Sequence, residues 1–380
     1  RKRNLISPAA IPYKTAIGTT FDSGDFQTVF EKALALAQIG RFEQRRAQSH
    51  EQGKLRGIGI SCFLEHSGGV PNEGAWLTFP GNGTLVVSLN VGNTGQGHAT
   101  VYTRLVADKL AIDPAQVKHR QGDSDFEIKG WPSVASRSTI TAGTAVVRTV
   151  EAMLEKGRAL AAQVLEADEK DIAYRRGLFE VVGTDRAIGL FDLAAKAADM
   201  KEKGEIAESL DTKRDVDTPQ TFPNGCHIAE VEIEPETGEV AVVGYYAVDD
   251  CGNVLDHTLA HGQVHGGIAQ GLGQVLFENA VYDRENGQLV TGSFMDYAMP
   301  RAHNMPSLLL DESHAVPATT NPLGVKGVGE AGTTASLAAI MNAIADAVPA
   351  AAHMDMPATM EKVWRACQGM ELPRAAPTAE

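Results

Sequence analysis

The feature that most limits how this chain can fold is a plan that occurs twice: a β-hairpin, a segment rich in Gly and Gln, and a helix. The first hairpin turns at 80–83 and the second at 235–238, with glycine supplying the positive φ that such turns need. In the second hairpin Ala229, Val231 and Ile233 alternate with glutamates, which predicts one apolar face. The repetition predicts an internal pseudo-duplication.

We therefore expect an α+β fold of two pseudo-repeated subdomains, each a mixed β-sheet with flanking helices. Helical spacing over 27–50 predicts one surface helix. The first residues carry no initiator Met and read as the continuation of a longer chain. The expected parts are a wrapping N-terminal segment (1–26), a first cofactor-binding subdomain (27–215), a second one (216–368) and a flexible tail (369–380).

Composition narrows the class of protein. The 34 Lys and Arg against 48 Asp and Glu give a net charge of -14, which disfavours a nucleic-acid partner. No apolar run approaches the ~20 residues that a membrane span needs. The 4 cysteines are scattered without a C-x-x-C pair, which argues against a disulfide framework, a zinc ribbon or an iron–sulfur site in this chain. A cytoplasmic setting is expected.

The segment "GVKGVGEAGTT" contains G-x-G-x-x-G, formed by Gly327, Gly329 and Gly332. A dinucleotide-binding loop would need a buried strand before it and an acidic residue about twenty positions later. The preceding residues are interrupted by Pro and Thr, and Glu330 would repel a pyrophosphate. The pattern therefore disfavours a dinucleotide site.

A carboxylate just before a helix is the more informative feature of this segment. The apolar spacing predicts a helix after Glu330, with Thr333 or Thr334 as its N-cap. The surrounding glycines leave room beside the carboxylate for another molecule. The plain alternative is a capping or solvated glutamate.

Three further loops carry ligand-binding chemistry. The Gly-Gln segments contain Gln96 in the first half and Gln263 and Gln270 in the second, and each amide can both donate and accept. The segment "SVASRSTITAG" offers hydroxyls and the guanidinium of Arg137, although an ordinary polar N-cap region explains it equally well. Since helix N-termini favour anions, the loops together suggest one large, polar, anionic cofactor.

His257, His261 and His265 recur every four residues and would line one helical face as a metal site. The neighbouring glycines make this segment a poor helix, and no acidic residue is placed as in H-E-x-x-H. We expect packing or capping histidines rather than metal ligands.

Taken in order, "NVGNTGQGHAT", "SRSTITAGTA", "GQVHGGIAQGLGQ", "MDYAMPRA" and "NPLGVKGVGEAGT" make the chain resemble one family. It resembles the C-terminal half of the large, molybdenum-binding subunit of the xanthine dehydrogenase/aldehyde oxidase/carbon monoxide dehydrogenase-type molybdenum hydroxylases. The resemblance implies a molybdenum–molybdopterin cofactor, expected in its cytosine dinucleotide form. It also implies hydroxylation of an aldehyde or N-heteroaromatic carbon with water-derived oxygen. The alternatives are a carbon monoxide-oxidising subunit and a non-catalytic half that is inert without its complement.

The resemblance also implies residue roles and partners. Glu330 would be the general base, and Gln96 would contact the pterin while Gly95 and Gly97 let the backbone approach it. The partners would be the N-terminal half of the same subunit, an iron–sulfur small subunit carrying [2Fe–2S], an FAD medium subunit and a small-molecule substrate, with the assembled complex forming a dimer. The other residues expected along the cofactor are Ala135, Ser136, Arg137, Ser138, Gln263, Gln270, Gly271 and Gly329.

Overall fold

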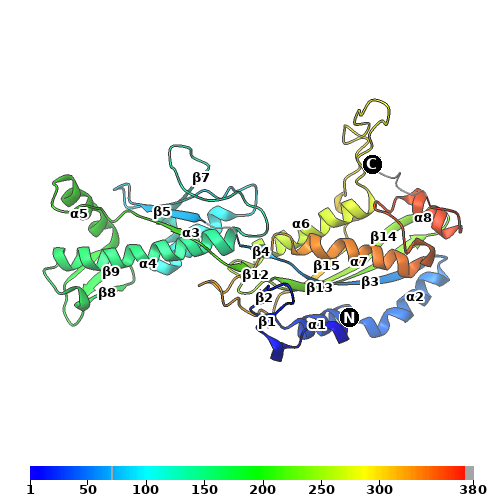
Figure 1. The fold of residues 1–380 in the computed structure, drawn as a ribbon, viewed down its shortest axis with the longest axis horizontal. Helices are drawn as coiled ribbons and strands as arrows, with labels where there is room; N and C mark the ends of the chain where they lie inside the picture. Colours follow the sequence, from blue (N-terminus) through cyan, green and yellow to red (C-terminus); the bar gives the residue numbers. More distant parts are fainter. Residues whose placement is uncertain (70–71, 373–380) are drawn as a thin grey trace. The chain divides into compact units, whose positions relative to one another are not determined.

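The computed structural model describes residues 1–69 and 72–372, and these form two compact units. Unit 1 comprises residues 1–66, 222–317 and the chain from Val328 on, and unit 2 comprises 67–221 and 318–327. Figure 1 shows the elements of both units along the chain. The expected tail at 369–380 lies outside the described residues from 373 on.

This division differs from the expected boundaries at 26/27 and 215/216. The chain passes between the units at 66/67, 221/222, 317/318 and 327/328. The first 66 residues belong with the second half of the chain because β3 pairs with β13, a contact between positions far apart in sequence.

Unit 1 is built on a four-stranded mixed sheet with strand order β15-β14-β13-β3. The parallel pair is β14 with β15, and the other pairs are antiparallel. The apolar alternation of the second hairpin is confirmed, because Ala229, Val231 and Ile233 are fully buried in one core. The strands are β3 (Leu55–Leu64), β13 (Asn224–Glu234), β14 (Glu239–Asp250) and β15 (Leu308–Asp311).

Helices α6 (His257–Leu276) and α7 (Ala331–Ala347) cover one face of this sheet. Two glycines of β3 allow α7 to approach closely. A Cβ added at Gly59 would lie 1.9 Å from the Ala339 carbonyl oxygen, and one at Gly57 would lie 2.0 Å from the Ala343 oxygen. A side chain at either position would displace the helix backbone.

The opposite face of the sheet is covered by α1 (Phe26–Leu36) and α2 (Phe42–Glu51). The single helix expected over 27–50 is therefore wrong. Gln38, at φ 46° in the left-handed region, ends the first helix, and a short 3₁₀ turn, Ile39–Arg41, leads into the second. The remaining small elements of unit 1 are β1 (Tyr13–Lys14), β2 (Thr20–Phe21) and α8 (Met360–Cys367).

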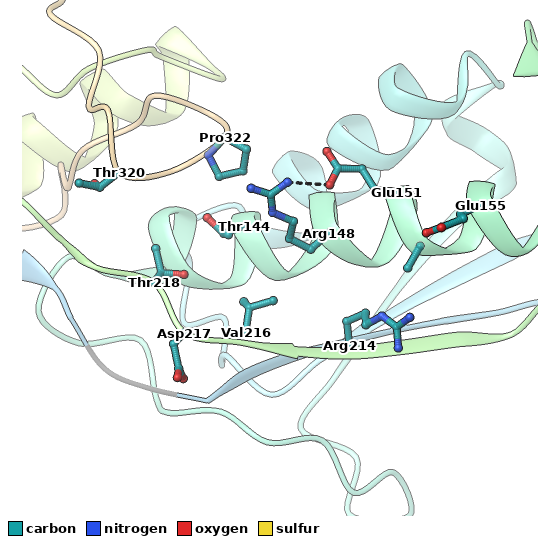
Figure 2. Close-up of a pocket in the computed structure, with 11 residues that line it drawn as sticks. Thr144, Arg148, Glu151, Glu155, Arg214, Val216, Asp217, Thr218, Thr320 and Pro322 are labelled. Carbon is teal, nitrogen blue, oxygen red and sulfur yellow. Dashed lines mark hydrogen bonds and ion pairs between the residues drawn. The ribbon is translucent and has the colours of Figure 1, made fainter.

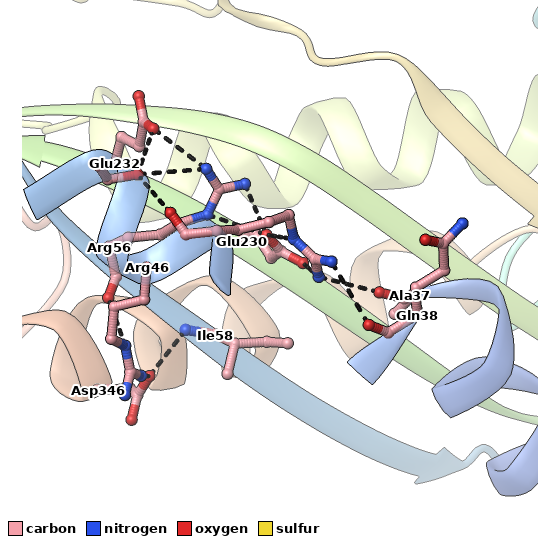
Figure 3. Close-up of polar contacts among 10 residues, drawn as sticks. Ala37, Gln38, Arg46, Arg56, Ile58, Glu230, Glu232 and Asp346 are labelled. Atoms are coloured by element: carbon pink, nitrogen blue, oxygen red, sulfur yellow. Dashed lines mark hydrogen bonds and ion pairs between the residues drawn. The ribbon is translucent and has the colours of Figure 1, made fainter. Parts of the chain in front are cut away.

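Ion pairs and hydrogen bonds connect α2 to this sheet, as Figure 3 shows. Glu230 is fully buried, and it accepts from Arg56 Nη2 at 2.7 Å and from Arg45 Nε at 3.0 Å. Arg56 also reaches Glu232 at 3.1 Å. Glu230 and Glu232 are thus paired with arginines, and the pairing compensates for the loss of water at the buried Glu230.

Unit 2 repeats the same kind of sheet with strand order β11-β5-β6-β7, in which only β6 and β7 are parallel. Helices α3 (His98–Leu110) and α4 (Ser138–Val164) pack on it through one apolar core. The expected hairpin around 80–83 is confirmed. The strands are β5 (Glu73–Thr78), β6 (Leu85–Leu89), β7 (Val117–Gln121) and β11 (Thr212–Val216).

Smaller elements complete unit 2. They are β4 (Ser67–Gly68) paired with β12 (Gln220–Thr221), the sheet of β8 (Ile172–Arg175), β9 (Leu178–Val181) and β10 (Ala187–Gly189), and α5 (Leu190–Glu202).

The pseudo-duplication is visible in the order of elements. Unit 2 runs β5-β6-α3-β7-α4 and unit 1 runs β13-β14-α6-β15-α7, with the second and third strands parallel in each. The fourth strand is β11 beside β5 in one unit and β3 beside β13 in the other. The expected α+β fold of two related subdomains is confirmed.

The structure corrects one detail of that repeat. The Gly-Gln segment of the second half is not a loop before a helix, because it lies inside α6. The loop that corresponds to "GNTGQGH" is the shorter stretch 251–256 between β14 and α6. Among the described residues, no helix has both the length and the apolar character needed to cross a membrane.

Candidate functional site

The loop between β6 and α3 presents Gln96 on a backbone that needs glycine on both sides. Gly95 has φ 116° and Gly97 has φ 77°, so both lie in the region that side chains disfavour. The side-chain carbonyl of Gln96 accepts from the backbone N–H of Thr94, and the side-chain amide nitrogen of Gln96 donates to Ser133 Oγ at 3.0 Å. These two bonds fix the side chain and leave one amide hydrogen available for a further acceptor.

The loop before α4 meets the Gln96 loop through two hydroxyls. Ser133 Oγ lies 2.7 Å from Ser138 Oγ, and Ser138 is the first residue of α4. The loop turns through Ala135 at φ 52° and Ser136 at φ 49°, two consecutive left-handed residues. Unit 2 therefore brings together Gln96, Ser133 and the N-terminus of α4.

Gly327 packs directly against this loop. A Cβ at Gly327 would lie 2.7 Å from the Ser136 Cβ and 2.4 Å from Ser67 Oγ. The glycine is therefore required by the close approach of the two loops.

Arg137 does not offer its guanidinium to a ligand, contrary to the expected role. Its side chain is fully buried and ion-paired with Glu73, which is also fully buried. It also donates to the carbonyls of Trp131 at 3.0 Å and Pro132 at 3.1 Å. Burial raises the pKa of Glu73 although Arg137 acts to lower it. Arg137 thus stabilises the loop before α4 through these hydrogen bonds rather than binding a ligand.

Glu330 lies in unit 1, where it is the N-cap residue of α7. Its side chain and Gly329 are exposed, while Ala331 and Gly332 behind them are buried. The expected N-cap role of Thr333 or Thr334 is wrong, because both lie inside the helix, where Thr334 donates to the Glu330 carbonyl at 2.8 Å. The carboxylate therefore stands at the positive end of a 17-residue helix.

Gln270 reaches the same end of α7. Thr333 Oγ1 lies 2.7 Å from Gln270 Oε1 and 3.0 Å from the Gly267 carbonyl. Gln263 is two turns earlier on the same face of α6. Gly271 is buried between the helices, since a Cβ there would lie 1.8 Å from Ser336 Oγ.

The glycines that argued against a helix at 257–276 are explained by this packing. Gly267 and Gly271, one turn apart, meet Gly332 and Ser336 of α7 at distances that no larger residue allows. Tertiary contact thus compensates for a poor helix propensity.

The three spaced histidines lie on α6. His257 and His261 both contact Glu312, the latter at 3.2 Å. Across the described residues no group of three or more His, Cys, Asp or Glu is arranged to hold a metal ion.

Sequence reasoning missed a buried aromatic group below the Gln96 loop. The Tyr102 ring lies 5.4 Å from that of His98 and 5.8 Å from that of His119, and its hydroxyl donates to the Ser138 carbonyl at 3.0 Å. Burial lowers the pKa of His98, and burial together with His98 lowers that of His119 to about 4. The spacing of His98 and Tyr102 on one helical face was the available signal, because residues four apart are neighbours.

A separate polar pocket of about 560 Å³ lies between α4 and β11 in unit 2, as Figure 2 shows. Arg148 pairs with Glu151 at its rim, at 2.8 Å. The pocket lining includes none of the expected site residues.

Comparisons with known proteins agree with this fold. A family profile described as "Molybdopterin cofactor-binding domain" matches residues 32–306. The chain is 32% identical over 382 residues to the 6-hydroxypseudooxynicotine dehydrogenase complex subunit gamma of Paenarthrobacter nicotinovorans, covering 97% of this chain and 48% of that protein. It is 30% identical over 384 residues to the carbon monoxide dehydrogenase large chain of Hydrogenophaga pseudoflava, covering 96% of this chain and 47% of that protein.

Solved structures give the same result. Quinoline 2-oxidoreductase from Pseudomonas putida 86 superposes with a TM-score of 0.86 at 29% identity, covering 98% of this chain and 49% of that one. The Cu,Mo-CO dehydrogenase also gives 0.86, at 27% identity, covering 97% of this chain and 48% of that one. The chain therefore spans about half the length of the relatives it matches.

Proposed function

Because this chain belongs to the molybdopterin cofactor-binding domain family, we propose that it forms the cofactor-binding part of a molybdenum hydroxylase in which Glu330 is the general base. The observation that carries this proposal is the exposed carboxylate at the start of α7, flanked by Gly329. A general base must be reachable by the substrate, and Glu330 alone among the expected residues is an exposed carboxylate.

The donors present fit a pterin cofactor. The Gln96 amide is held by Thr94 and Ser133, and a Cβ at Gly95 would meet no atom within 4 Å, which leaves space beside the amide. The backbone N–H groups at the start of α4 suit the phosphates of such a cofactor. We assign Gly95, Gln96, Gly97, Ala135, Ser136, Ser138, Gln263, Gln270 and Gly329 to its binding, and Arg137 and Gly271 to supporting positions.

The proposed reaction is R–H + H₂O → R–OH + 2 e⁻ + 2 H⁺. The bound molybdenum–pterin group supplies the acceptor for the two electrons. Glu330 accepts a proton from the water-derived oxygen as that oxygen attacks an electron-poor carbon. Gln96 and the small residues of the neighbouring loops orient the cofactor rather than the substrate.

The names of the relatives guide the choice of substrate. By their names, one reported relative acts on 6-hydroxypseudooxynicotine and the enzyme of one solved structure acts on quinoline, which favours an N-heteroaromatic carbon over an aldehyde. The carbon monoxide dehydrogenase large chains, at 30% and 28% identity, support carbon monoxide as the second candidate. We further propose the cytosine dinucleotide form of the cofactor and partners that carry [2Fe–2S] and FAD.

Isolation of the complete complex from its source cell tests this function. We expect molybdenum and pterin bound with the large subunit, and turnover of an N-heteroaromatic compound in ¹⁸O-labelled water should place the label in the product. Label derived from dioxygen, or a complex without pterin, would contradict the proposal. A complex that holds the cofactor and turns over neither N-heteroaromatics, aldehydes nor carbon monoxide would support the inert cofactor-binding half instead.

A further inference from the structure

Two of the four cysteines meet in the folded chain. Cys62 on β3 and Cys226 on β13 are register partners in the antiparallel pair, and their sulfur atoms lie 3.7 Å apart. They are 164 residues apart in sequence, so no spacing pattern shows the pair.

The pair lies on the face of the unit 1 sheet that α1 covers. Cys226 is 1% exposed and packs among apolar residues that include Val29 and Ile228. Cys62 lies nearer the surface and is only partly buried. Cys62 is therefore the more accessible of the two thiols.

The backbone already has the geometry of a disulfide. Residues directly opposite in an antiparallel pair have Cα atoms about 4.5–5.5 Å apart. Disulfides are found at Cα separations of about 4.4–6.8 Å. The register pairing of Cys62 and Cys226 is therefore compatible with a disulfide.

The two thiols differ in reactivity. Hydrogen bonding with Cys226 lowers the pKa of Cys62 to about 7, with a smaller contribution from the Arg1 guanidinium. Hydrogen bonding with Cys62 and burial raise the pKa of Cys226. Cys62 is thus the thiolate that attacks an oxidant, and Cys226 is the thiol that resolves the product.

We propose that Cys62 and Cys226 are a modification site, forming a reversible disulfide when the protein meets a peroxide. The Cys62 thiolate attacks hydrogen peroxide, breaking the O–O bond to give a sulfenic acid and, with one proton, water. The Cys226 sulfur then attacks the sulfenic sulfur and releases a second water. In sum, two thiols and H₂O₂ give one disulfide and two waters, and a dithiol reductant reverses the change.

The bond would close a long loop, because it joins positions 164 residues apart. Closing a long loop restricts the unfolded chain more than the folded one. The oxidised protein should therefore unfold at a higher temperature than the reduced protein.

Peroxide treatment of the folded chain tests the proposal. We expect two of the four thiols to disappear, a mass loss of two hydrogens, and a peptide cross-linked through Cys62 and Cys226. Dithiothreitol should restore both thiols. A folded chain in which Cys62 gains oxygen atoms without cross-linking, or in which no thiol is lost, would overturn the proposal.

Matched variants separate this pair from the other thiols. Cys251→Ser and Cys367→Ser should keep the cross-link, whereas Cys226→Ser should leave a sulfenic acid on Cys62 that dimedone traps. Should Cys226→Ser fail to fold, Cys62→Ser removes the more accessible partner and should abolish the cross-link in a chain with the wild-type circular dichroism spectrum. A cross-link that survives in a folded Cys62→Ser chain would contradict the assignment.

Discussion

The two units place different residues at the same position of the same fold. Arg137 is the N-cap of α4 in unit 2, and Glu330 is the N-cap of α7 in unit 1. Arg137 is fully buried and paired with Glu73, whereas Glu330 is exposed beside Gly329. One copy of the repeat therefore has a buried arginine at this position, and the other has an exposed carboxylate, which we propose to be the general base.

The two sheets also differ in how arginines pair with their buried carboxylates. One buried carboxylate of unit 1, Glu230, pairs with Arg45 and Arg56. The buried carboxylate of unit 2, Glu73, pairs with one arginine, Arg137, and accepts from the Thr141 hydroxyl at 3.4 Å. Burial raises the pKa of Glu73 despite Arg137, so the ion pair does not fully compensate for the loss of water.

Removal of the buried N-cap residue should give the largest change in stability. Arg137→Ala leaves the Glu73 carboxylate buried without its partner, which should cost about 3–5 kcal/mol in the free energy of unfolding. Glu330→Ala, at the exposed N-cap, should change it by no more than about 0.5 kcal/mol. Urea unfolding of the full chain measures both. The double variant Glu73→Gln/Arg137→Met should recover part of the lost free energy of unfolding. Equal effects of Arg137→Ala and Glu330→Ala would contradict the difference described between the two N-cap positions.

The fourth strands of the two sheets should also respond differently. Gly59 on β3 meets the α7 backbone, so Gly59→Ala should cost about 1–3 kcal/mol through forced displacement. Arg214 on the corresponding strand β11 is exposed, and Arg214→Ala should stay within about 0.5 kcal/mol. Thermal unfolding of the two variants checks this. A tolerated Gly59→Ala would show that α7 does not depend on close approach to β3.

The corresponding helices α3 and α6 differ in glycine content, and not every glycine of α6 is needed. A Cβ at Gly262 would meet no atom within 4 Å, so Gly262→Ala should raise the free energy of unfolding by about 0.5–1 kcal/mol. Gly271→Ala, against Ser336, should lower it. The denaturant midpoints of the two variants show whether each substitution raises or lowers the free energy of unfolding. A destabilising Gly262→Ala would contradict the open surroundings described for Gly262.

The last predicted effect concerns the pH dependence of stability and belongs to unit 2. Because burial lowers the pKa of His119 to about 4 from its ordinary 6.5, the folded chain keeps this ring neutral in that interval while the unfolded chain binds a proton. Its contribution to stability is therefore complete above pH 6.5 and is lost as the pH falls toward 4. His119→Gln should flatten the dependence of the urea midpoint on pH across this interval, and an unchanged slope would argue against the assignment.

Local patterns were sufficient to predict much of the fold. Alternation around the turns at 80–83 and 235–238 predicted both hairpins, and apolar spacing after Glu330 predicted α7. The glycines in α6 misled the prediction, because their role depends on contact with Gly332 and Ser336 some 65 residues later.

The candidate site was predicted less completely for the same reason. Gln96 and Ser138 are brought together through Ser133, as the loops suggested. The burial of Arg137 depends on Glu73, which lies 64 residues earlier, and no pattern around Arg137 indicates that partner. The meeting of Cys62 with Cys226 likewise depends on strand register alone.

Turnover by Glu330→Gln in the complete complex, with its molybdenum and pterin content measured on the same sample, tests the central claim most directly. The substitution keeps the size of the side chain and removes its ability to accept a proton. We predict that kcat falls by about 10²–10⁴-fold while the cofactor content stays at the wild-type level. A variant with full cofactor content and near wild-type kcat would show that Glu330 is not the base.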